Sequence, residues 1–146
     1  MNLFDKENQW RFTKIAEQRR NKIKLEGEDA LIAEVMNQHP EFDTIWPLGE
    51  FSAQPREIGG MVVNPFVHTA LHVIIEQQIE KERPPAIAET FKKLLRQGKE
   101  RHEASHQIAT IYANHYFTTF RKGQPFDELS YVFDVQALVD QPDSQF

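Results

Sequence analysis

The sequence predicts an all-α protein, a single-domain helical bundle of about five to six helices with one long ordered loop. Two observations favour this fold class. Apolar residues recur at helical spacing between caps, prolines and glycines that end each segment, and alternating strand patterns are weak along the 146 residues. We expect the domain to cover residues 1–140 and the tail at 141–146 to be frayed.

The first two predicted helices cover about residues 5–25 and 26–38. The first has sparse apolar positions among many charges. The second opens with acidic residues, which complement the helix dipole, and then carries apolar residues at the spacing of one buried face. It ends at His39-Pro40, because the residue before a proline is disfavoured in the helical conformation.

Residues 39–63 form the long loop, with three prolines and three glycines. Its aromatic and aliphatic side chains favour an ordered wrap that packs on the core and contains one helical turn. A lid over a functional site is the alternative interpretation, because a connection of this length is uncommon in a compact domain unless it packs or functions.

Four further helices follow the loop. Asparagine followed by proline is a strong helix start, because asparagine caps the helix and proline fits its first position. Glycine favours the end of a helix, since it adopts the left-handed conformation there. These signals predict helices at about 64–81, 84–98, 100–121 and 125–139.

Composition excludes several classes of function. A net charge of −5 argues against sequence-independent binding of nucleic acid. The absence of cysteine excludes disulfides, thiolate metal sites and cysteine nucleophiles. The sequence start lacks a signal-peptide pattern and no apolar run could span a bilayer. We therefore expect a cytoplasmic protein that binds neither nucleic acid nor membranes.

Four of the six histidines form two pairs with identical spacing, His68 with His72 and His102 with His106. Side chains four residues apart on a helix lie on one face. Each pair is in the first two turns of its predicted helix. If the helix between them returns the chain, both pairs lie at one end of the bundle.

Four neutral imidazoles at one level are a plausible site for a divalent metal ion, zinc or another borderline transition metal. We therefore predict His68, His72, His102 and His106 as metal ligands. Glu76 continues the first row by one turn, and His39 in the loop can reach the same place, so both are further candidates. The alternative is that the histidines are partly buried and hydrogen-bonded to backbone or carboxylates.

The motifs "NQHPEF", "NPFVHTALHVIIEQQ", "RPPAIAETF", "RHEASH" and "GQPFDELSYV" together resemble an uncharacterised bacterial family of small helical proteins. That family is known only as a domain of unknown function. The resemblance implies that His39 and both pairs occupy the family's histidine positions, and it implies no activity. Gln77 falls where the family has glutamate, and Ala86 where it often has glycine.

Two functions follow from these patterns. The first is a metal-binding protein, which would be a metal-dependent enzyme of unknown substrate if the ion keeps an open position. The second is a non-catalytic module that binds a protein or a small molecule and whose histidines are structural or respond to pH. The sequence leaves the oligomeric state and the reaction open.

Overall fold

The computed structural model describes residues 3–141, and the chain divides into two compact units, Met1–Val73 and Ile74–Phe146. Among the described residues the secondary structure is almost entirely helical, with one small antiparallel hairpin. The predicted all-α class is therefore confirmed. The prediction of one domain over residues 1–140 stays a prediction.

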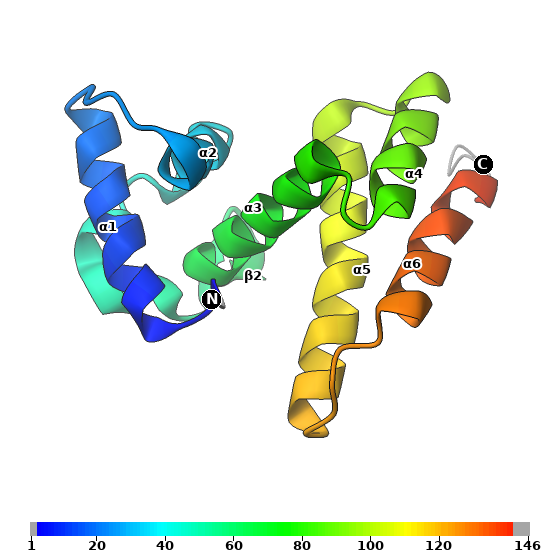
Figure 1. The fold of residues 1–146 in the computed structure, drawn as a ribbon. Coiled ribbons are helices and arrows are strands. Elements are labelled where there is room, and N and C mark those ends of the chain that lie inside the picture. Colours follow the sequence, from blue (N-terminus) through cyan, green and yellow to red (C-terminus); the bar gives the residue numbers. More distant parts are fainter. Residues whose placement is uncertain (1–2, 142–146) are drawn as a thin grey trace. The chain divides into compact units, whose positions relative to one another are not determined.

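The first unit contains α1 (Lys6–Arg20) and α2 (Gly27–Asn37), which pack against each other (Figure 1). The first helix is shorter than predicted. It ends at Arg20 because Lys22 takes a left-handed conformation, with φ of 58°. The Lys22 N–H then donates to the carbonyl of Arg19 and the Ile23 N–H to that of Gln18. These two bonds form the usual helix-ending motif without glycine.

The segment after α2 is more structured than predicted. It forms two 3-10 helices, Pro40–Phe42 and Trp46–Ala53, and then strands β1 (Arg56–Ile58) and β2 (Met61–Val63). The strands pair antiparallel with Glu57 opposite Val62, joined by a two-glycine turn. This hairpin is not predictable from the sequence, since strands of three residues are too short to show an alternating pattern.

The core of the first unit is aromatic. Phe12 of α1 lies 4.8 Å from Phe66 and 6.2 Å from Trp46, measured between ring centroids. Phe42 and Trp46 from the loop are buried, as expected of an ordered wrap, whereas Leu48 and Phe51 are exposed. The segment 39–63 therefore covers the core with only part of its apolar side chains.

Helix α3 (Pro65–Lys81) begins where the sequence predicts. The Asn64 side chain accepts a hydrogen bond from the Val67 N–H at 3.1 Å and donates one to the Ala53 carbonyl at 2.9 Å. It therefore caps the helix and also fixes the preceding loop to the helix start.

The second unit contains α4 (Pro85–Arg96), α5 (Arg101–Arg121) and α6 (Glu128–Gln136), which pack together and alternate in direction (Figure 1). The predicted glycine stops are confirmed, because Gly98 and Gly123 take positive φ immediately after the C-cap residues of α4 and α5. The last helix begins later than predicted, because the Asp127 carboxylate caps it by accepting from the Ser130 N–H. A 3-10 turn, Ala137–Asp140, follows α6.

Candidate metal centre

Three histidines meet within the first unit. His39 lies in the turn after α2, and His68 and His72 lie one turn apart on α3. Their ring centroids are 4.9 Å apart for His39 and His68, 4.9 Å for His39 and His72, and 4.8 Å for His68 and His72. The three rings thus form a nearly equilateral triangle, which we call the histidine triad.

The end of α2 positions His39. Its backbone N–H donates to the Met36 carbonyl at 3.0 Å, and its Nδ1 lies 2.8 Å from the Val35 carbonyl oxygen. A carbonyl only accepts, so Nδ1 carries the proton and Nε2 is left with its lone pair. Ligating histidines in metalloproteins are commonly held this way, with the second ring nitrogen donating to a backbone carbonyl.

The nitrogen that faces the triad is close to a nitrogen of His68. The Nε2 atoms of His39 and His68 are 3.3 Å apart. A ring nitrogen of His72 lies within 4.8 Å of one on His39, and likewise of one on His68. The three rings are therefore close neighbours within the first unit.

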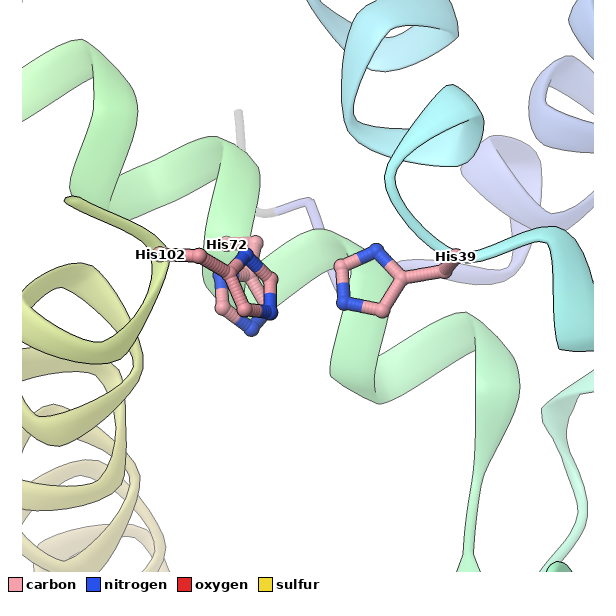
Figure 2. A group of neighbouring side chains, drawn as sticks. All are labelled: His39, His72 and His102. Atoms are coloured by element: carbon pink, nitrogen blue, oxygen red, sulfur yellow. The ribbon is translucent and has the colours of Figure 1, made fainter. Parts of the chain in front are cut away.

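Figure 2 shows the rings of His39, from the turn after α2, and His72, from α3, directed toward each other. Both side chains are buried, with exposed fractions of 3% and 2%. Phe42 stacks parallel to His39 at 5.6 Å and meets the His68 ring edge-on at 5.6 Å. The rings of His39 and His68 consequently pack against the ring of Phe42.

Sequence reasoning included His39 only as an additional candidate, because nothing in a loop histidine before proline distinguishes a helix terminator from a ligand. The signal that could have found it is its position. A residue directly after a helix can return a ring nitrogen to the carbonyl four residues earlier, as His39 does to Val35.

The second predicted pair lies in the second unit. His102 and His106 are on the first turns of α5, as predicted, with ring centroids 6.5 Å apart. Partial burial lowers the pKa of His106, and the charge of His102 lowers it further. A lowered pKa favours the neutral form of the imidazole, which is the form that binds a metal ion.

Glu76 forms an ion pair within the second unit. Its two carboxylate oxygens accept from Nη1 and Nη2 of Arg101 at 2.8 and 2.7 Å, and the Arg101 guanidinium also lies over the Phe91 ring. The carboxylate is thereby engaged with a cation that stands at the start of α5. Sequence spacing placed Glu76 in the row of His72 but could not show this partner.

His115, outside both pairs, also has a carboxylate partner, because its Nε2 lies 2.7 Å from Oδ2 of Asp134 on α6.

None of the helices in the described part of the chain is long and apolar enough to cross a membrane.

The fold and the triad together define a mostly α-helical protein with a compact histidine cluster in its first unit. The chain belongs to a family described as a domain of unknown function, DUF1841, whose model matches residues 5–137. Neither the curated proteins nor the solved structures include a significant match to the chain.

Proposed function

We propose that this protein binds a divalent metal ion through His39, His68 and His72. The observation that carries the proposal is the 3.3 Å separation of Nε2 of His39 and Nε2 of His68. Two nitrogens that each lie about 2.0–2.1 Å from a tetrahedral ion are about 3.3 Å apart. The bond from His39 Nδ1 to a backbone carbonyl supports the same assignment, since it presents the lone pair of Nε2 to the ion.

The donor set indicates the class of metal. Imidazole suits zinc, copper, nickel and iron, whereas magnesium and calcium require oxygen ligands. The chain has no cysteine, so thiolate cannot contribute. Zinc or another borderline transition metal fits three neutral imidazoles in a largely apolar surrounding.

Three histidines on a tetrahedral ion keep one position for water or substrate, which is the arrangement of catalytic zinc sites. This supports a metal-dependent enzyme whose substrate stays undefined. The sequence pattern supports a second version of the proposal, in which His102 or His106 fills the fourth position of the same ion. An ion with a fourth protein ligand would be closed and structural.

Metal analysis of protein purified without an affinity tag tests the proposal. We expect about one zinc or similar ion per chain, and less than a tenth of that in His39→Ala and His72→Ala. His115→Gln is the matched control, because it removes a histidine whose partner is Asp134 and should keep the metal.

The non-catalytic alternative explains the same contact without a metal ion. The 3.3 Å between Nε2 of His39 and Nε2 of His68 also fits an N–H···N hydrogen bond between neutral imidazoles. Protein that carries no metal, gains none on incubation with zinc, cobalt or nickel, and melts at an unchanged temperature would overturn the metal proposal. The triad would then be a hydrogen-bonded core.

A further inference from the structure

The second unit contains a pocket of about 400 Å³ that includes none of the proposed metal ligands. Pockets for small molecules begin at roughly this size. Aromatic rings, two prolines, one amide and two side chains of opposite charge surround it: Gln78, Arg83, Pro84, Pro85, Tyr112, Phe126, Glu128 and Tyr131.

Aromatic rings form the floor of this pocket. The ring centroids of Tyr112, Phe126 and Tyr131 lie between 5.1 and 5.5 Å from one another. Tyr131 is fully buried, and its hydroxyl donates to Oε1 of Gln78 at 2.6 Å. Burial raises the pKa of both tyrosines, so these hydroxyls stay neutral and the floor carries no charge.

The rim carries the two charges, and local structure positions both of them. Arg83 follows α3, where its backbone N–H donates to the Gln78 carbonyl at 3.2 Å. Glu128 is the first residue of α6, directly after the capping Asp127. Both side chains are exposed, and within residues 3–141 neither one forms an ion pair. Two opposite charges therefore border one pocket without neutralising each other.

We infer that this pocket binds a small zwitterion with an apolar side chain, the chemical class of a free aromatic or large aliphatic amino acid. The carboxylate of such a ligand pairs with the Arg83 guanidinium, which suits a planar acid group. Its ammonium pairs with Glu128, and its side chain covers the rings of Tyr112 and Phe126. A ligand with only one charge leaves one rim residue unpaired and meets a like charge there.

Calorimetric titration with three related probes tests the inference on the whole chain. L-phenylalanine carries both charges, phenethylamine lacks the carboxylate, and 3-phenylpropanoate lacks the ammonium. We expect L-phenylalanine to bind in the micromolar to millimolar range, and each single-charge probe to bind about tenfold more weakly, the usual effect of losing one charged hydrogen bond.

Two substitutions assign the charges. Arg83→Gln should bring L-phenylalanine to the affinity of phenethylamine, and Glu128→Gln should bring it to that of 3-phenylpropanoate. Arg96→Gln and Glu89→Gln are matched controls on exposed positions of α4 outside the pocket, and they should leave all three affinities unchanged. Melting curves of each variant verify that it is folded.

Three results would overturn the inference. The first is no detectable binding of L-phenylalanine to the folded wild-type chain. The second is equal binding of all three probes. The third is a Glu128→Gln variant that melts lower but binds L-phenylalanine unchanged, since Glu128 would then serve only the dipole of α6.

Discussion

The two histidine pairs share one spacing but differ in their surroundings. His68 and His72 have ring centroids 4.8 Å apart and meet a third ring, His39, within their own unit, where His39 and His72 are buried and His68 is half-buried. His102 and His106 have centroids 6.5 Å apart, and His106 is partly desolvated but far more exposed than His72. Identical i, i+4 spacing therefore places two rings on one helix face but does not by itself build a site.

Within the first unit, further aromatic side chains pack against the pair His68 and His72. The turn at His39-Pro40 brings a third imidazole to α3 together with the ring of Phe42. The triad thus combines three imidazoles, of which His39 and His72 are buried and His68 is half-buried. The comparison predicts that the triad dominates the affinity for metal.

The largest expected effect is on zinc affinity. His72→Ala should weaken zinc binding at least about a hundredfold, because a few ligands share the whole binding free energy of the ion and each contributes several kcal/mol. The double variant His102→Ala with His106→Ala should lose less, about tenfold, since three ligands remain. Competition with a chromophoric chelator measures both. If the double variant binds zinc more weakly than His72→Ala does, the second pair contributes more to the zinc affinity than the triad, against the prediction.

Removal of the metal should lower the melting temperature. A ligand at about a hundred times its dissociation constant stabilises the folded state by about 2.7 kcal/mol, which is about 5–10 °C for a chain of this size. We therefore expect EDTA to lower the melting temperature by this amount in the wild type and in His115→Gln, and to have no effect on His39→Ala. An equal shift in all three proteins would mean that the triad does not hold the stabilising ion.

Variants of the Glu76–Arg101 ion pair distinguish a structural role of Glu76 from a role in metal binding. Arg101→Ala should lower the free energy of unfolding by about 1–3 kcal/mol, because it leaves a nearly buried carboxylate without its partner. Urea denaturation measures this loss. Zinc affinity should stay unchanged in Glu76→Gln, and a large loss there would make Glu76 a ligand after all.

The smallest effect concerns the cap of α6, far in sequence from the triad. The backbone N–H and the hydroxyl of Ser130 hold the pKa of Asp127 below its usual value. A lowered folded-state pKa adds stability above about pH 4 that is lost as the pH falls through the folded value. Asp127→Asn should therefore flatten the acid limb of a stability–pH profile. An unchanged limb would contradict this assignment.

The start of α3 and the ends of α4 and α5 were predictable from sequence because their causes are local. Asn64 caps α3 through its own side chain, and Gly98 and Gly123 end helices by taking positive φ. The end of α1 was not predictable, since Lys22 adopts the conformation that sequence rules assign to glycine. The cap at Asp127 was not predicted, because Pro125 precedes it and also matches the residue preference of a first helical position.

The candidate site was predictable only in part. Spacing identified His68 and His72 as a pair, because a helix fixes the direction of residues four apart. The central place of His39 and the engagement of Glu76 by Arg101 depend on contacts across 29 and 25 residues of chain. Local patterns carry no information on such contacts, so only the folded structure reveals them.

X-ray absorption spectroscopy of the zinc-loaded, untagged protein tests the central claim most directly. The account predicts at least three imidazole nitrogens at about 2.0–2.1 Å from zinc and the loss of one of them in His39→Ala. A zinc shell of oxygen ligands with fewer than two imidazoles, unchanged in His39→Ala, would contradict it.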